Sequence, residues 1–322
     1  MLDYPSISVV LAAYNAKAYI RNAIEGVLAQ TLSDFELLIV DDGSTDGTDK
    51  LCDEYAKNDA RIRIFHEQHR GVTHARQVAI CHARGKYIIR IDADDKTAPY
   101  MLEEMLYAAE EANADMLICN YWELSTKGCV SITQQPSGLS PATVANDLLE
   151  GRLFGALWNK MFRTSCIKKN NIHFHQGLDL REDIVFVLDT LPYIERIAYL
   201  PKAFYTYDRH ANANSLSNTY LTENRHYYEQ EILWHKAALD CPLINSDNKR
   251  RFMSGLLNYA YITLSGKFYS AEEWTAVFQP CYEMFREVGA SYKRRMVLWA
   301  LKGHFSSASL LRRVIALFRG TS

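Results

Sequence analysis

The chain has 322 residues, which is long enough for one large domain or for a catalytic domain with a smaller appendage. With 48% hydrophobic and 23% charged residues it has the composition of a globular protein, which excludes a disordered or fibrous chain. The formal net charge of −2 argues against nucleic acid as a partner, because nucleic-acid binding needs a strongly basic surface.

The cysteine pattern and the lack of targeting segments indicate a cellular compartment. The seven cysteines are scattered and never form a C-x-x-C pair, which argues against a disulfide framework or a zinc ribbon and favours a reducing compartment. Asp3, Pro5 and Ser6 precede the first apolar run, so a secretory signal is not expected. No apolar stretch approaches the roughly 20 residues that span a bilayer. We therefore expect a cytoplasmic protein, or one held peripherally on the cytoplasmic face of the inner membrane.

Strand-like and helix-like segments alternate over the first 120 residues. Buried strands are predicted at Ile7–Ala13, Phe35–Val40, Arg61–Phe65, Tyr87–Ile91 and Asp115–Asn120. Helices are predicted between them, near residues 20–28 and at Asp49–Lys57, Gly71–Ala83 and Met101–Ala112. This α/β alternation predicts a parallel sheet that is covered by helices on both faces. In such sheets, ligands bind beyond the carboxyl ends of the strands.

The pattern loosens in the second part of the chain. Ser125–Pro141 is polar and rich in turn residues, so it is predicted to be a loop. A helix is predicted at Thr143–Leu153 and a late strand at Tyr199–Tyr207. From about Thr222 onward the chain is expected to be mostly helical.

An acidic cluster follows the fourth predicted strand. Asp92, Asp94 and Asp95 lie within four residues, and their mutual repulsion must be offset. A divalent cation does so, and Mg²⁺ or Mn²⁺ prefers carboxylate together with phosphate oxygens. Such a cation also stabilises the charge that develops on a diphosphate leaving group. The structural alternative is a solvated acidic loop that caps the next helix.

A second acidic cluster follows the second predicted strand. It consists of Asp41 and Asp42, followed by a Gly-Ser turn. An aspartate at a strand end can accept the imide N–H of uracil, and the turn leaves backbone N–H groups free to face a ligand. The same four residues also make an ordinary turn before a helix, so this cluster alone is a weak signal.

Several motifs in order resemble family 2 glycosyltransferases of the GT-A fold. The matching segments are Ile7–Asn15, Gln30-Thr31, Phe35–Asp46, Gly71–Arg76, Gly85–Ile88 and Asp92–Asp95. The resemblance covers roughly residues 5–125 closely and 155–215 more loosely. It implies a GT-A mixed sheet and metal-dependent, inverting transfer from a nucleotide-sugar donor, usually a UDP-sugar.

The resemblance also implies roles for donor-site residues. Ala12 and Tyr14 would lie beside the nucleobase, and Asp42 would bind the uracil. Arg76 belongs to the segment that lies near the diphosphate.

The acidic cluster after the fourth strand matches the family's D-x-D pattern. By this resemblance Asp94 and Asp95 would hold the ribose and the metal, Mn²⁺ or Mg²⁺, and Asp92 would complete the donor site.

Inverting transfer needs a general base, which contributes about 10²–10⁴ in rate. Glu182 and Asp183 precede an apolar run and match the family's acidic pair at a helix start, where Asp183 takes the base position. The alternative, a carboxylate stabilised by the helix dipole, is compatible with that role. On the acceptor side we expect Glu182 and Trp158, although a buried aromatic side chain is nearly as good an interpretation of Trp158.

Residues 291–322 carry seven Lys or Arg, no Asp or Glu, and many apolar residues. Basic amphipathic helices of this kind lie on anionic membranes. The alternative is a terminal helix whose apolar face packs on the domain.

These observations predict a GT-A catalytic domain at residues 1–220 and a helical extension at 221–322. Within the catalytic domain, residues 1–125 form the nucleotide-sugar half and 126–220 the acceptor half. The expected activity moves a hexose or N-acetylhexosamine to a hydroxyl of a glycan or glycolipid in bacterial lipopolysaccharide or capsule synthesis. Two alternatives are a sugar-nucleotidyltransferase and a non-catalytic glycosyltransferase-like binding protein.

Overall fold

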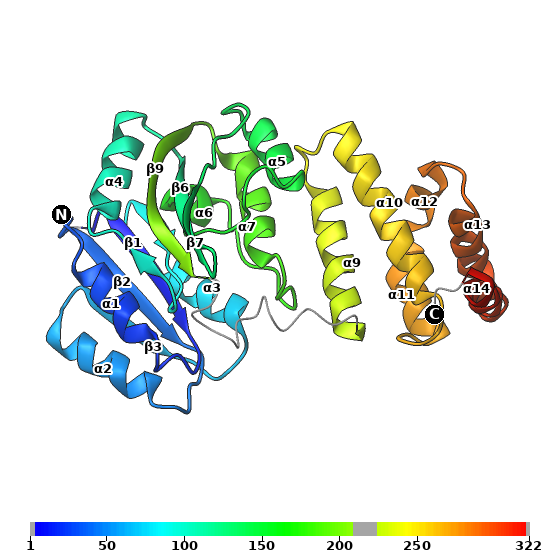
Figure 1. Cartoon of the computed structure of the whole chain (residues 1–322), viewed down its shortest axis with the longest axis horizontal. Coiled ribbons are helices and arrows are strands. Elements are labelled where there is room, and N and C mark those ends of the chain that lie inside the picture. The colour runs from blue at the N-terminus through cyan, green and yellow to red at the C-terminus, as the bar shows by residue number, and fades with distance from the viewer. Residues whose placement is uncertain (1–3, 209–223, 320–322) are drawn as a thin grey trace. The chain divides into compact units, whose positions relative to one another are not determined.

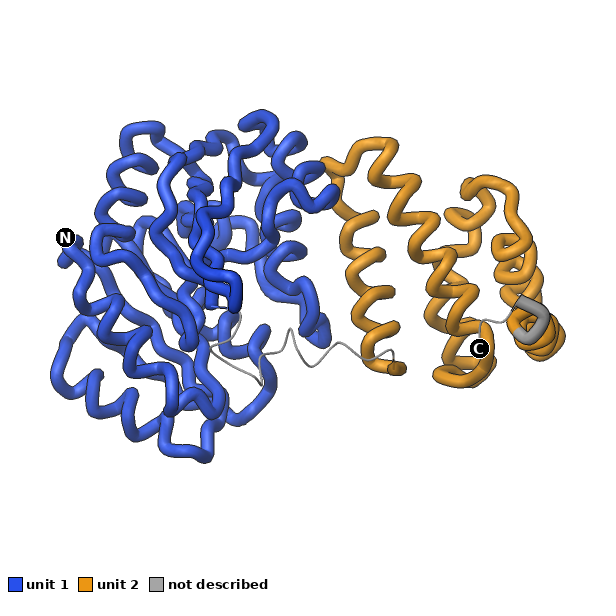
Figure 2. Tube along the Cα trace, in the orientation of Figure 1, with its two compact units in different colours: residues 1–215 blue, residues 216–322 orange. Residues whose placement is uncertain are grey.

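The computed structural model describes residues 4–208 and 224–319, and side chains as far as residue 316. The chain divides into two compact units, residues 1–215 and 216–322 (Figure 2). The predicted boundary at residues 220 and 221 lies outside the described residues.

The first unit is built on one mixed sheet with the strand order β3-β2-β1-β4-β8-β6-β9-β5, and β7 pairs with β6 (Figure 1). The strands are β1 (Ile7–Ala13), β2 (Phe35–Asp41), β3 (Ile62–His66), β4 (Tyr87–Arg90), β5 (Lys96–Thr97), β6 (Met116–Ser125), β7 (Gly128–Ile132), β8 (Lys160–Arg163) and β9 (Ile197–Asp208). β1 to β4 are mutually parallel where they pair, whereas β8 runs antiparallel to both β4 and β6. The sheet is therefore mixed, as the GT-A resemblance implied, and not parallel throughout as the α/β alternation alone suggested.

Helices pack on this sheet because each presents an apolar stripe to it. The helices of the first unit are α1 (Ile20–Leu28), α2 (Thr48–Asn58), α3 (Val72–His82), α4 (Met101–Glu111), α5 (Pro141–Leu149), α6 (Thr164–Lys169) and α7 (Glu182–Thr190), with a 3₁₀ turn at Leu191–Tyr193. α3 packs on β1 and β2, α2 on β2 and β3, and α4 on β6 and β9. The central strands β1 and β2 are consequently almost entirely buried.

The prediction of a loop at Ser125–Pro141 was wrong in part. β6 and β7 form an antiparallel hairpin in which Ser125 pairs with Gly128. The residues of β7 are mostly exposed, so the strand lacks the apolar alternation that would have indicated it. A strand of this kind is held by backbone pairing to β6 and not by burial.

The second unit is helical in the part that the structure describes. It contains α9 (Arg225–Asp240), α10 (Ser246–Thr263), α11 (Ala271–Phe278), α12 (Tyr282–Glu287), α13 (Tyr292–Trp299) and α14 (Phe305–Arg319), with a 3₁₀ turn at Gln279–Cys281 and a π-type turn at Ala300–His304. Its own core surrounds Trp274, whose indole N–H donates to the carbonyl oxygen of Ala260 at 3.1 Å. Among the described helices, none is both long enough and apolar enough to cross a membrane.

Candidate active site

The carboxyl ends of three neighbouring parallel strands form the edge of the sheet where the acidic clusters lie. β1 pairs with β2 on one side and with β4 on the other, so Tyr14, Asp42 and Asp92 follow adjacent strands. This is the edge at which open α/β sheets bind ligands. The structure therefore brings the predicted donor-site segments to one region of the molecule.

Arg76 links this edge to the first turn of α7. Its Nη1 donates hydrogen bonds to Oε1 of Glu182 and, at 3.1 Å, to Oδ1 of Asp183. The Nη2 of Arg76 also lies 3.8 Å from Oδ1 of Asp92. The predicted base and the predicted diphosphate-side arginine, more than 100 positions apart in the chain, are thus in direct contact.

Arg90, which the sequence analysis did not single out, is the centre of this cluster. Its Nη1 donates to Oδ1 of Asp183 at 2.5 Å, and its Nη2 donates to Oδ2 of Asp92 at 2.8 Å. Burial disfavours the charged guanidinium, but the carboxylates of Asp183, Asp92 and Glu182 outweigh burial and raise the pKa of Arg90. A charged residue inside the apolar run of β4 was the signal that could have identified it.

The cluster also holds hydrogen-bond donors that its own carboxylates do not use. The buried Nε atoms of Arg76 and Arg90 have no hydrogen-bond partner within the described residues. Burial and the neighbouring charge of Asp183 raise the pKa of Glu182, against the opposing effect of Arg76 and Arg90. Both Nε atoms are shielded from solvent, so a ligand reaches these donors only if the side chains shift.

Asp95 differs from the other two aspartates of its cluster. It is 3% exposed, and its carboxylate accepts hydrogen bonds from the hydroxyl of Tyr205 at 2.7 Å and from the backbone N–H of Asp208 at 3.0 Å. Burial, together with the charges of Asp92 and Asp94, raises the pKa of Asp95 to about 8. Asp95, which was predicted to be a metal ligand together with Asp94, instead ties the loop after β4 to β9 in this structure.

The remaining aspartates, Asp92 and Asp94, are half-buried and keep contact with solvent. Within the described residues, no group of three or more His, Cys, Asp or Glu side chains is arranged to hold a metal ion. The donor set therefore does not form an all-protein cage. It fits the way Mg²⁺ and Mn²⁺ bind in phosphate sites, through one or two carboxylates plus substrate phosphate oxygens.

Asp42 organises the loop that leads into α3. Its carboxylate accepts the backbone N–H groups of Arg70 and Gly71, both at 2.9 Å, and lies 2.8 Å from Nδ1 of His69. The His69 ring stacks on Tyr14 with a centroid distance of 4.0 Å. A predicted nucleobase contact and the predicted uracil acceptor are thus joined through His69, which sequence reasoning missed. Ala12 is the half-buried next-to-last residue of β1, two positions before Tyr14.

Trp158 is a core residue, which corrects the expectation that it offers a face to a sugar. It is 2% exposed, and its ring stacks on Tyr205 with centroids 4.5 Å apart. The member of this aromatic cluster that is open to solvent is Phe154, at 40% exposure. The buried Lys160 holds the segment, because its Nζ donates to the carbonyl oxygens of Phe154 at 2.6 Å and Ala156 at 2.7 Å.

Comparison with known proteins identifies the family of this chain. Residues 8–136 match the family model "Glycosyl transferase family 2". The uncharacterized glycosyltransferase YibD of Escherichia coli is 30% identical over 71% of this chain and 70% of its own length. The chain belongs to glycosyltransferase family 2. The putative glycosyltransferase EpsH of Bacillus subtilis is 29% identical over 89% of this chain and 83% of its own length.

The fold is also found in solved structures. The S. aureus TarS fragment 1–349, in complex with UDP-GlcNAc, superposes with a TM-score of 0.67 over 98% of this chain and 92% of that fragment, at 20% identity. The mannosyltransferase PcManGT from Pyrobaculum calidifontis, in complex with GDP-Man and Mn²⁺, gives a TM-score of 0.54 over 97% of this chain and 88% of that one, at 14% identity. The GT-A fold is thus confirmed, and the chain is a glycosyltransferase, as the family 2 match shows. Family membership sets aside the two alternatives, a sugar-nucleotidyltransferase and a non-catalytic binding protein.

Proposed function

We propose that this glycosyltransferase moves a hexose or N-acetylhexosamine from a UDP-sugar, with inversion, to a hydroxyl group of a glycan or glycolipid. The product belongs to bacterial cell-surface polysaccharide synthesis, such as that of lipopolysaccharide or capsule. The observation that carries the proposal is the hydrogen-bonded link from Asp183 through Arg90 to Asp92. This link joins the proposed general base to the acidic loop on the donor side.

The donor side is formed by Ala12, Tyr14, Asp42, Arg76 and Asp92. Asp42 keeps lone pairs that can accept the imide N–H of uracil in addition to the N–H groups it already binds. The exposed Tyr14 ring, 48% accessible and stacked on His69, offers a face beside the base. The UDP-GlcNAc complex of the similarly folded TarS fragment supports a UDP-sugar as donor.

Asp94, together with Asp92, would hold a divalent cation, Mn²⁺ or Mg²⁺, while Asp95 supports the loop from within the core. When bound, the cation offsets the charge that develops on the leaving diphosphate. The Mn²⁺ in the PcManGT structure supports this choice of ion. The guanidinium groups of Arg76 and Arg90 place positive charge beside this loop.

Asp183 acts as the general base of a single displacement. Its carboxylate takes the proton of the acceptor hydroxyl while the hydroxyl oxygen forms a bond with the anomeric carbon. The bond from that carbon to the diphosphate breaks with its electron pair, and UDP leaves. Arg76 and Arg90 orient the carboxylate from one side through Oδ1. Glu182, bound to Arg76, lies next to Asp183 on the acceptor side, and the exposed ring of Phe154 offers an apolar platform for a sugar.

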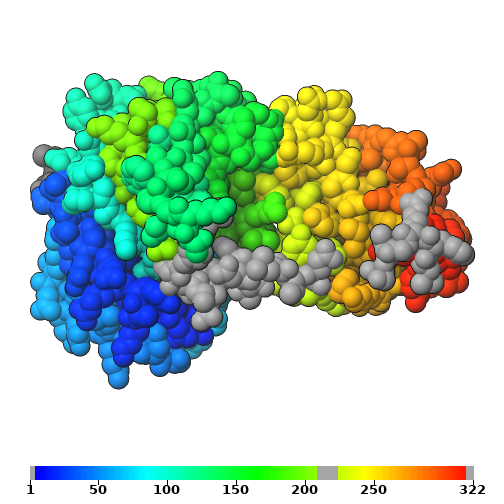
Figure 3. All heavy atoms as spheres, in the orientation of Figure 1, coloured from blue at the N-terminus to red at the C-terminus, as the bar shows by residue number. Residues whose placement is uncertain are grey.

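We propose that residues 1–220 form the catalytic domain and that residues 221–322 form the helical extension. We assign the donor to residues 1–125 and the acceptor to 126–220. The C-terminal segment 291–322 would hold the enzyme peripherally on the anionic cytoplasmic face of the inner membrane, close to glycolipid acceptors. α14 is drawn in red in Figure 3. It contributes the exposed side chains of Leu310, Leu311 and Val314 to this surface.

The donor class is tested by thermal-shift titration with UDP-, GDP- and dTDP-sugars in the presence of Mn²⁺, followed by detection of the released nucleotide. The proposal expects stabilisation by UDP-sugars and release of UDP. Stabilisation by GDP- or dTDP-sugars alone would show that the donor is not a UDP-sugar. Release of pyrophosphate would contradict glycosyl transfer itself.

A further inference from the structure

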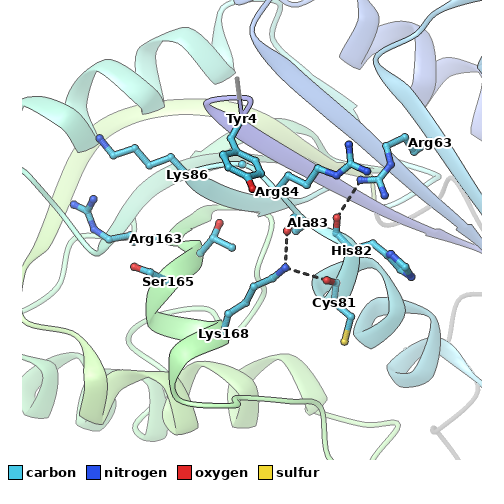
Figure 4. A pocket seen from close by; sticks show the side chains of 12 residues that line it. Tyr4, Arg63, Cys81, His82, Ala83, Arg84, Lys86, Arg163, Ser165 and Lys168 are labelled. Atoms are coloured by element: carbon cyan, nitrogen blue, oxygen red, sulfur yellow. Dashed lines mark hydrogen bonds between the residues drawn. The ribbon is translucent and has the colours of Figure 1, made fainter. Parts of the chain in front are cut away.

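A cavity of about 620 Å³ lies at the opposite edge of the sheet from the acidic cluster (Figure 4). Its walls come from the segment before β1, from β3, from the α3–β4 connection, and from the junction of β8 with α6. In the β1–β4 ladder Ile7 pairs with Tyr87, and in the β4–β8 ladder Tyr87 pairs with Arg163, so these walls gather at the amino ends of the parallel strands. Lys86 and Asp92 are six positions apart, which separates the two edges by about 20 Å of extended chain. The cavity is thus distinct from the donor site.

The lining of this cavity is strongly basic. Six cationic or titratable basic side chains line it, and the described lining contains no Asp or Glu: Arg63, His82, Arg84, Lys86, Arg163 and Lys168. Three of them have carboxylate partners outside the lining, because Arg63 pairs with Glu36, Lys86 with Glu110 and Arg163 with Asp115. These pairs hold the walls in place and leave the other cations to determine the charge of the cavity.

Within the part of the chain that the structure describes, neither Arg84 nor Lys168 forms an ion pair with a carboxylate, so these two residues provide the unpaired positive charge of the cavity. The Nζ of Lys168 donates to the carbonyl oxygens of Cys81 at 2.9 Å and Ala83 at 2.6 Å, which keeps the ammonium at the cavity wall (Figure 4). The Arg84 side chain is exposed, whereas its backbone N–H is fixed by Glu36 at 2.6 Å. A fixed backbone, with no ion pair on the guanidinium group among the described residues, places Arg84 to contact an anion in the cavity.

Thr164 supplies an independent sign of a ligand. It lines the cavity, is 7% exposed, and its hydroxyl has no hydrogen-bond partner among the described residues. Leaving a buried hydroxyl unsatisfied costs about 1–3 kcal/mol, so such a group is expected to have a partner when the protein is at work. The hydroxyl oxygen is shielded from solvent in this structure, so a rotation of the Thr164 side chain toward the cavity would let a ligand oxygen provide that partner.

We propose that this cavity binds a phosphate group, carried by a small molecule or by a lipid headgroup, at a site separate from the sugar-donor site. A phosphate has several acceptor oxygens arranged as a tetrahedron, so it can accept hydrogen bonds at once from Arg84, Lys168 and Thr164. The volume is that of a site for an organic ligand and exceeds what a lone ion needs. The exposed ring of Tyr4 lines the cavity and offers an apolar contact for the rest of the molecule.

The test is calorimetric titration of the full chain with sn-glycerol 3-phosphate, with and without excess UDP to fill the donor site. Wild-type binding should survive excess UDP, and Arg84→Gln should weaken it about tenfold, the value of one charge-assisted hydrogen bond. Thr164→Val, which keeps the shape of the side chain but removes the hydroxyl, should weaken it several-fold. The control Arg250→Gln removes an exposed arginine of α10 and should change nothing.

A second arm measures binding to phosphatidylcholine vesicles with and without phosphatidic acid. Binding to the phosphatidic acid vesicles that Arg84→Gln weakens and Arg250→Gln leaves intact assigns the phosphate to a lipid headgroup. Binding of glycerol phosphate alone, with the same response to the variants, assigns it to a soluble ligand. If neither probe binds, or if Arg84→Gln and Thr164→Val bind as the wild type does, the proposal is overturned. UDP affinity serves as the folding control, because it should be the same in all variants.

Discussion

Arg90 and Asp183 lie 93 positions apart in the chain and are joined by a 2.5 Å hydrogen bond from Nη1 to Oδ1. The same guanidinium binds Asp92, so one buried side chain of β4 connects the first turn of α7 with the loop after β4. A glycosyltransferase needs its base and its donor-side carboxylates at a fixed separation, and Arg90 is placed to set it.

Replacing Arg90 by Gln should therefore lower both stability and turnover. Breaking a buried ion pair leaves carboxylates uncompensated and costs about 3–5 kcal/mol, whereas kcat should fall more than KM rises because Asp183 loses its orientation. Urea unfolding and steady-state kinetics check the two effects. Arg61→Gln, which removes a partly exposed pair with Asp59, is the matched control and should cost less than about 1 kcal/mol. Wild-type kcat in Arg90→Gln would remove Arg90 from this positioning role.

Asp183→Asn should abolish transfer and keep donor binding. The amide cannot take a proton from the acceptor hydroxyl, so the rate should drop by about 10²–10⁴, while UDP affinity stays near that of the wild type. Kinetics and UDP calorimetry on the same preparation separate the two effects. A variant that still transfers sugar at the wild-type rate would exclude Asp183 as the base.

Asp94→Ala should abolish turnover, whether or not Mn²⁺ or Mg²⁺ is added. A chelator should inactivate the wild type, and re-added Mn²⁺ should restore it. Asp95→Ala is the informative comparison, since Asp95 is buried and bonded to Tyr205, and removal of its side chain should lower the melting temperature as well. An active Asp94→Ala enzyme with unchanged metal dependence would contradict the assignment.

The C-terminal segment is best tested by substitution, because deletion of residues 291–322 would remove part of the second unit's core, including Met296, Val297 and Ala308. Leu310→Ser with Leu311→Ser should weaken binding to anionic vesicles about thirtyfold, as each half-exposed leucine contributes roughly 1 kcal/mol on burial. Leu233→Ser, an exposed leucine of α9, is the control. Vesicle binding that is unaffected by the double variant would show that this apolar surface does not contact the membrane.

Lys160 should make stability depend on pH. Burial lowers the pKa of Lys160 to about 7 in the folded protein, well below its ordinary value. At a pH between the pKa of Lys160 in the folded protein and its ordinary pKa in the unfolded chain, the unfolded chain binds more protons. The contribution of Lys160 to the free energy of unfolding therefore increases as the pH rises through this range. Below about pH 7 this contribution is constant. The difference between wild type and Lys160→Met should grow in favour of the wild type by up to about 1.4 kcal/mol per pH unit above pH 7. Urea titrations at several pH values measure this slope, and a flat difference would contradict it.

Local sequence determined much of the fold of the first unit. The apolar runs of β1, β2 and β4 and the helices between them are predictable because burial and periodicity act within a few residues. The acidic residues at the strand ends were equally visible, since their position follows from where each strand stops. The sequence did not predict β7, because its residues are exposed and the strand is held by backbone pairing alone.

The tertiary structure decided what each candidate side chain does. Asp94 and Asp95 are neighbours with the same chemistry, yet only the packing of Tyr205 against Asp95 makes one of them a core residue and leaves the other beside solvent. Trp158 became a core ring for the same reason, and Arg90 became the link to Asp183. The sequence alone determined which residues stand at each strand end, because the burial that ends a strand acts over a few residues. Contacts between segments about a hundred residues apart decide which of these residues meet and which remain open to a ligand.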